Sequence, residues 1–143
     1  MVIEGQNGQL MVIVEKGQNL VETLTSVAKE FKLKGGRISG VGAVEHVELG
    51  YYELHEKSYI RKTFSEGDFE LISLNGNITL KGGEPYVHVH TSIGDKNFQV
   101  YGGHLFEAVV AVTAEVHIFP LGTMPERLPN ADIGLDLVCG IRD

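Results

Sequence analysis

The stretch NLVETLTSVAKEFKL, residues 19–33, decides the fold class. Its apolar side chains recur at helical spacing and form one stripe: Leu20, Val21, Leu24, Val27, Ala28 and Phe31. Asn19 is placed to cap the N-terminus, and Glu22 three residues later would complete a capping box. Gly35 and Gly36 are placed to end the helix. We therefore predict one principal amphipathic helix, at about residues 19–33.

The segments on both sides of this helix have the pattern of β-strands. Residues 9–15 are almost continuously apolar, and the chain after the helix is a series of short apolar or alternating segments separated by turns. Strands are predicted at 9–15, 37–44, 45–53, 58–64, 69–74, 77–80, 86–93, 98–101, 105–119 and 133–139. One helix among strands joined by turns predicts an α+β fold, with a mainly antiparallel, strongly curved β-sheet and the helix packed on it.

Three local patterns lead to further expectations. The pair Asn75-Gly76 predicts a hairpin turn or a bulge. Residues 123–132 contain Pro125 and Pro129 and are interpreted as a surface loop. Cys139 lies in an apolar segment and is expected to be a small buried hydrophobic residue.

Length and composition indicate one ordinary globular domain covering residues 1–143. The chain has 143 residues, of which 43% are hydrophobic, and a single cysteine, which excludes an intramolecular disulfide and fits a reducing compartment. The N-terminus has no basic region followed by an apolar stretch, and no apolar run approaches the length of a bilayer span. We therefore expect a cytoplasmic protein with no membrane partner.

The feature of the sequence that is most informative about function is a set of three histidines. His88 and His90 are two residues apart in a predicted strand, so both side chains point to one face. If the hairpin loop that follows is three or five residues long and centred on Lys96, His88 lies opposite His104 and His90 opposite Gly102. All three imidazoles then share a face, and directly opposite Cβ atoms are about 4.5–5.5 Å apart. An even-length loop would turn His104 away.

Three imidazoles on one face suit a divalent metal ion. Zinc is the first expectation, and Fe, Ni or Cu are alternatives. Three protein ligands with one open position is the arrangement of catalytic zinc, although water or a residue of another subunit could fill that position. The alternative interpretation is structural: His88 and His90 are surface residues of a strand, and His104 is held by a hydrogen bond.

A metal-dependent reaction would also need a general base. Glu115 is the candidate, because it alternates with Thr113 and His117 inside an apolar strand, where carboxylates are rarely buried without a partner. It would line a cavity or a subunit interface, or simply face solvent. Three weaker candidates are Glu107, Tyr52 and Tyr101. His46 and His55 lie in a polar stretch and are expected to be exposed.

The charge of the chain bears on nucleic-acid binding. The net charge is −7, whereas contact with phosphates requires clustered Lys and Arg. One short segment offers such a cluster, formed by Lys29, Lys32, Lys34 and Arg37. The alternative is that these are solvated cations at the end of a helix, where they complement the helix dipole.

Several motifs in order resemble the PPC domain, the plant and prokaryote conserved domain that also occurs in plant AT-hook nuclear proteins. The motifs are GGRISGVGA at 35–43, LGYY at 49–52, GDFELISLNGNI at 67–78, PYVHVH at 85–90, GGHL at 102–105 and AVTAEV at 111–116. The match covers roughly residues 8–121, and a loop and a final strand make up 122–143. The resemblance implies a fold with an antiparallel sheet and one principal helix, assembled as a homotrimer.

The resemblance also implies a function. Prokaryotic members are described as DNA-binding by analogy with the plant proteins, and His88, His90 and His104 match positions that look like ligands for a divalent metal. This chain has no Arg-Gly-Arg-Pro core of an AT-hook. We predict a trimeric, metal-binding PPC-domain protein associated with DNA. The alternative is a metal-dependent enzyme or small-molecule-binding protein that uses the same three histidines, and a metal that only staples the fold or the trimer is a third possibility.

Overall fold

Helix α1, Leu20–Glu30, is the α-helix of the computed structural model, which describes residues 1–142. Asn19 caps it as predicted, because its side-chain oxygen accepts a hydrogen bond of 3.1 Å from the backbone N–H of Glu22. The helix ends earlier than predicted. Lys32 adopts a left-handed conformation with φ of 52°, and the N–H of Leu33 returns to the carbonyl of Ala28, which closes a Schellman motif before the two glycines.

The rest of the described chain is mostly strand. The strands are β1 (Val2–Glu4), β2 (Leu10–Glu15), β3 (Gly36–Glu53), β4 (Ser58–Lys81), β5 (Glu84–Gly94), β6 (Val100–Pro120), β7 (Met124–Asn130) and β8 (Leu135–Arg142), with a short 3-10 turn at Gln6–Gly8. They form one sheet in the order β1-β2-β6-β3-β4-β7-β8, and β5 pairs with both β4 and β6. Among the described strands, only the short β4–β7 pairing is parallel. The α+β class with a mainly antiparallel, curved sheet is therefore confirmed.

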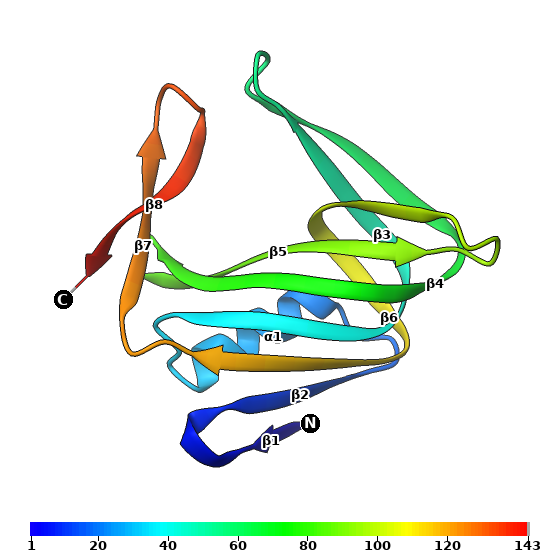
Figure 1. Ribbon diagram of the computed structural model, residues 1–143, viewed down its shortest axis with the longest axis horizontal. Helices are drawn as coiled ribbons and strands as arrows, with labels where there is room; N and C mark the ends of the chain where they lie inside the picture. The colour runs from blue at the N-terminus through cyan, green and yellow to red at the C-terminus, as the bar shows by residue number, and fades with distance from the viewer. Residues whose placement is uncertain (143) are drawn as a thin grey trace.

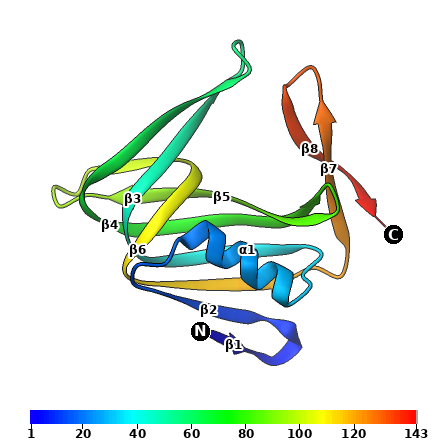
Figure 2. The same cartoon turned by 180° about the vertical axis from the view of Figure 1, so that it is seen from behind.

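Several predicted strands are parts of longer, bent strands. The predicted segments 37–44 and 45–53 are both in β3, which carries register shifts between Gly40 and Gly42 and between Glu45 and Val47. These bulges bend the strand without ending it. As Figures 1 and 2 show, two hairpins, β3–β4 and β7–β8, project from the same side of the sheet.

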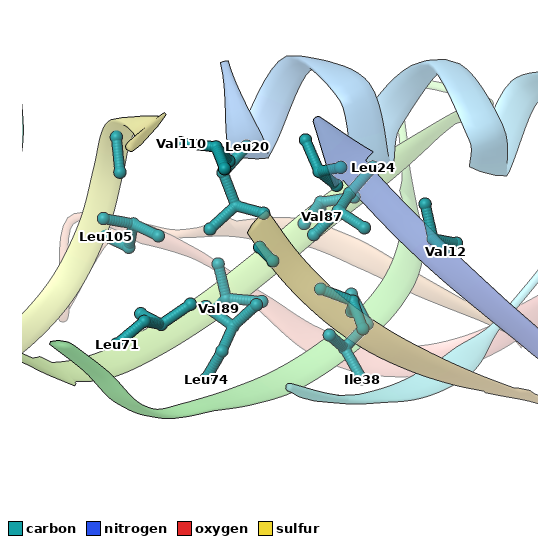
Figure 3. Packing of buried hydrophobic residues seen from close by; sticks show 14 of the residues in the cluster. Val12, Leu20, Leu24, Ile38, Leu71, Leu74, Val87, Val89, Leu105 and Val110 are labelled. Carbon is teal, nitrogen blue, oxygen red and sulfur yellow. The ribbon is translucent and has the colours of Figure 1, made fainter. Parts of the chain in front are cut away.

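The core lies between α1 and one face of the sheet. Buried residues of the helix, Leu20 and Leu24 among them, pack toward Val87 and Val89 of β5 and Val110 of β6 (Figure 3). Full burial of such a side chain contributes about 1.5–3 kcal/mol. Because Val87 and Val89 face the helix, His88 between them is directed to the opposite face of β5. None of the described residues belongs to a helix that is both long and apolar enough to span a bilayer.

Three local expectations were wrong. Asn75-Gly76 is not a turn: Gly76 lies inside β4 opposite Val89, and a Cβ there would collide with the backbone oxygen of His88, so the glycine permits close pairing of two strands. Residues 124–130 form strand β7, in which the prolines are tolerated because β7 pairs only briefly with β4. Cys139 is exposed, since β8 lies in a projecting hairpin.

Candidate metal centre

The loop between β5 and β6 sets the phase of the histidines. It comprises residues 95–99, which agrees with the prediction of a three- or five-residue loop. The Asp95 carboxylate accepts hydrogen bonds from the backbone N–H groups of Asn97 at 2.8 Å and Gln99 at 2.9 Å, and Phe98 takes a positive φ of 62°. These contacts centre the loop on Asn97, one residue beyond Lys96.

Centring the loop on Asn97 instead of Lys96 changes which residues of β5 and β6 pair, but it leaves the three histidine side chains on the same face of the sheet. His90, rather than His88, lies opposite His104, and Gly102 lies opposite Ser92. The predicted pairing of His88 with His104 was therefore wrong, because the partner of His104 lies two residues further along β5. Because the loop has an odd number of residues, the three histidines still share one face, as predicted.

The three imidazoles form a compact cluster. Their ring centroids are 5.1 Å apart for His88–His90, 5.1 Å for His88–His104 and 5.4 Å for His90–His104. One nitrogen from each ring can be chosen so that all three atoms lie within 4.8 Å of one another. His104 is 8% exposed, His88 is half-buried and His90 is exposed. The cluster is therefore closed to solvent at His104 and open to solvent at His90.

The surroundings keep two of the rings uncharged. Burial lowers the pKa of His88 to about 4, and the positive charge of Arg127 lowers it further than either neighbouring histidine does. Burial also lowers the pKa of His104 to about 4, followed by the effects of His90 and of Arg61. Both rings are therefore neutral at pH 7, the form in which imidazole binds a metal.

The donor set fits a metal ion. Nδ1 of His104 is a buried polar atom without a hydrogen-bond partner among the described residues, and such atoms are costly unless something binds them. Two nitrogens bound to one zinc at about 2.1 Å each are at most about 4.2 Å apart. Small side-chain rotations are therefore enough to bring the three nitrogens of this cluster into coordination distance.

Arg127 of β7 lies against the cluster. Its Nη2 donates to Nδ1 of His88 at 2.9 Å and to Oδ1 of Asn77 at 3.2 Å, and its Nε donates to Thr79 at 2.9 Å. A guanidinium only donates, so Nδ1 of His88 is the acceptor, and the proton of the neutral ring is on Nε2. A metal at either nitrogen would break this hydrogen bond: at Nδ1 the metal would displace Arg127, and at Nε2 it would require the ring proton to move to Nδ1, which could then no longer accept from Arg127.

A cavity of about 250 Å³ adjoins the cluster. Its walls come from β4, β5, β6 and the C-terminal hairpin, and it is lined by Tyr59, Lys81, Tyr86, His88, His104, Phe106, Arg127, Leu135, Asp136 and Leu137. Phe106 packs edge-on against His104 with ring centroids 4.7 Å apart, and Tyr59 lies 5.3 Å from the same ring. The histidines thus lie at the side of a small chamber with aromatic walls.

The other predicted site residues lie elsewhere. Glu115 is exposed on β6 and does not line the cavity. Glu107 is exposed, Tyr52 donates to the carbonyl of Ile133 at 2.7 Å, and Tyr101 donates to Gln99 at 3.0 Å. None of these three lines the cavity. His46 and His55 are exposed, as predicted.

The basic segment is exposed as well. Lys29, Lys32, Lys34 and Arg37 all reach solvent, and Lys29 forms a salt bridge of 3.4 Å with Glu84. Arg37 lies over the ring of Phe119 at 5.8 Å. The cations are accessible, but one of them is already paired with a carboxylate.

Sequence reasoning missed the residues around the histidines. Tyr86 and Phe106 could have been found, because each is two residues from a histidine of the cluster in the same strand and so shares its face. Arg127 carried no such signal: it lies in a segment that was interpreted as a surface loop, and only the folding of β7 onto β4 brings it to His88.

The chain matches one domain family and is similar to several solved structures. The model of the Plants and Prokaryotes Conserved (PCC) domain matches residues 2–122. A plant- and prokaryote-conserved (PPC) protein of Pyrococcus horikoshii is 33% identical, with a TM-score of 0.86 over 99% of this chain and 96% of the other. A metal-containing protein of Archaeoglobus fulgidus is 32% identical, with a TM-score of 0.88 over 98% of this chain and 99% of the other.

A third solved structure has a different description. A Bacteroides thetaiotaomicron protein described as a "putative dna binding protein" is 27% identical, with a TM-score of 0.91 over 96% of this chain and 94% of the other. No curated protein matches the chain. The match of the domain model ends before β7, so the hairpin that carries Arg127 lies outside it.

Proposed function

The chain belongs to the Plants and Prokaryotes Conserved (PCC) domain family, and from this premise we propose that it binds one divalent metal ion through His88, His90 and His104. Zinc is the first expectation, with Fe or Ni as alternatives, because neutral imidazoles suit all three. The observation that carries the proposal is the cluster itself: three imidazoles from two strands, with nitrogens within 4.8 Å and a buried, unpartnered Nδ1 on His104. The metal-containing protein of Archaeoglobus fulgidus, 32% identical, supports it.

Such a centre has a use beyond stability. A bound metal with an open position polarises a carbonyl group or lowers the pKa of a water molecule. In this chain a cavity of about 250 Å³ is lined by His88 and His104, two of the three histidines. That arrangement favours a metal centre that binds a small molecule over a metal ion that only cross-links two strands.

The metal proposal is tested on untagged protein purified without added metal. Elemental analysis should find about one ion per chain, and the triple variant H88A/H90A/H104A should retain none. The matched control is H46A/H55A, which removes exposed histidines outside the cluster. Equal metal content in the triple variant and the control would overturn the proposal.

We also propose that the working form is a homotrimer. The projecting β3–β4 hairpin supports this, because it exposes Tyr51 and Ile60, which lie opposite each other, and Leu54 near its end. Light scattering should give three times the 15.6 kDa mass of the chain. A trimer that persists without metal indicates a functional ion, whereas a trimer that dissociates when the ion is removed indicates a staple.

DNA association is the second candidate function. The exposed Lys32, Lys34 and Arg37, repeated by the symmetry of a trimer, would form the contact surface, and the description of the Bacteroides thetaiotaomicron relative favours this candidate. Binding to phosphates must weaken steeply with salt. A mobility-shift titration in which no complex forms even at low salt would remove DNA association while leaving the metal proposal intact.

A further inference from the structure

The cavity beside the histidines contains one cation that no carboxylate neutralises. Lys81 and Asp136 both line the cavity, and they pair with each other at 2.7 Å. Arg127, by contrast, donates only to neutral acceptors: Thr79, Asn77, His88 and the backbone carbonyl of Asp136. It forms no ion pair with any carboxylate among the described residues. The chamber therefore holds one uncompensated positive charge.

Arg127 is fixed in place. Its guanidinium lies 5.4 Å from the centre of the Tyr86 ring, and its Nε donates to Thr79, which is 2% exposed. Its four hydrogen bonds to the described residues use the Nε–H, one N–H of Nη1 and both N–H groups of Nη2. The second N–H of Nη1 is left for a ligand, and a metal bound at Nδ1 of His88 would release another.

The other walls are largely apolar. Tyr59, Phe106 and Leu137 face the same chamber as Arg127, and its volume of about 250 Å³ equals roughly eight water molecules. Cavities for drug-sized ligands are larger, about 300–1,000 Å³. The occupant that matches this chamber is a small molecule with an apolar body and one polar end.

We propose that this cavity binds a small organic monocarboxylate, with its carboxylate on Arg127 and its apolar body against Tyr59 and Phe106, which pack edge-on with ring centroids 5.0 Å apart. A single uncompensated cation matches a single negative charge, and the free N–H of Nη1 can donate a charge-assisted hydrogen bond to one carboxylate oxygen. A dianionic phosphate fits less well, because Asp136 places a negative charge in the same chamber. The biological meaning of this ligand rests on the proposed metal centre beside it, but its binding can be tested without metal.

Benzoate is the probe, and benzamide is its uncharged counterpart of the same shape. Calorimetric titration should show at least tenfold tighter binding of benzoate than of benzamide to the unaltered protein, since hydrogen bonds to charged groups contribute about 1.5–3 kcal/mol. In Arg127→Met this preference should disappear, whereas Arg127→Lys should keep part of it. Lys16→Met, which removes a charge from an exposed turn, is the matched control and should bind benzoate normally.

The titration is carried out on zinc-loaded and on chelator-treated protein, with inorganic phosphate as a further ligand. If the protein prefers benzoate but takes up no zinc when zinc is supplied, the anion site is supported and the metal proposal fails. Zinc binding without a preference for benzoate over benzamide would overturn the anion site alone, and so would tighter binding of phosphate than of benzoate. The comparison of the two probes needs no variant, so it remains decisive if Arg127→Met fails to fold.

Discussion

Arg127 donates a hydrogen bond of 2.9 Å to Nδ1 of His88, although the two residues are 39 positions apart in the chain. The contact joins the C-terminal hairpin to the histidine cluster. It also contributes to the low pKa of His88, because a fixed positive charge opposes protonation of the ring. The hairpin is thus part of the wall of the site.

The first prediction concerns the stability of this wall. Arg127→Met removes hydrogen bonds to Thr79, Asn77, His88 and the carbonyl of Asp136. We expect the free energy of unfolding to fall by about 1–3 kcal/mol, since the buried Thr79 and three partly buried acceptors lose their donor. Urea denaturation measures the change, with Lys16→Met as the control. A loss no larger than that of the control would mean that the hairpin is held by other contacts.

The second prediction concerns metal and stability. Zinc that binds only the folded protein stabilises it by about 2.7 kcal/mol when the free ion is at 100 times its dissociation constant. Zinc should therefore raise the melting temperature of the unaltered protein and of His55→Ala, whose side chain is exposed. It should leave the melting temperature of His104→Ala unchanged. An equal rise in all three proteins would show that zinc acts outside the cluster.

The third prediction concerns pH. In the metal-free protein the pKa of His88 and of His104 is about 4, below the ordinary value of 6.5. Between these values the unfolded chain binds more protons than the folded one, so folding stability increases with pH and is lost as pH falls from 6.5 toward 4. We expect a loss of about 1–3 kcal/mol over this window, after allowing for solvent screening at the half-buried His88.

Denaturation at a series of pH values measures this loss. His104→Phe removes one of the two titrating rings, so the curve of this variant should be flatter between pH 4 and 6.5. His46→Phe, at an exposed site, should follow the unaltered protein. Parallel curves for His104→Phe and the unaltered protein would contradict the assignment.

The fourth prediction concerns the backbone beneath His88. A Cβ at Gly76 would collide with the backbone oxygen of His88 and with Val89, so the two strands must separate to accept it. Gly76→Ala should therefore destabilise the protein by about 1–3 kcal/mol and weaken zinc binding. Gly122→Ala is the matched control, because a Cβ there meets nothing within 4 Å. Calorimetric melting curves compare the two, and equal stability would contradict the predicted crowding.

Much of the histidine site could be predicted from local spacing. The period of two in a strand put His88 and His90 on one face, and the odd loop brought His104 to the same face. The exact partner could not be predicted, because loops centred on Lys96 and on Asn97 both have odd lengths. The choice between them comes from the Asp95 carboxylate, which holds the N–H groups of Asn97 and Gln99.

The sequence by itself determined the helix, its cap at Asn19, the α+β class and the shared face of His88 and His90, because each depends on spacing within a few residues. Only the tertiary structure decided that Asn75-Gly76 lies inside a strand and that Arg127 lies on His88. Both depend on which distant strands pair, and that is set by packing of the whole sheet. The cavity and its uncompensated charge follow from that pairing, so they had no local signature.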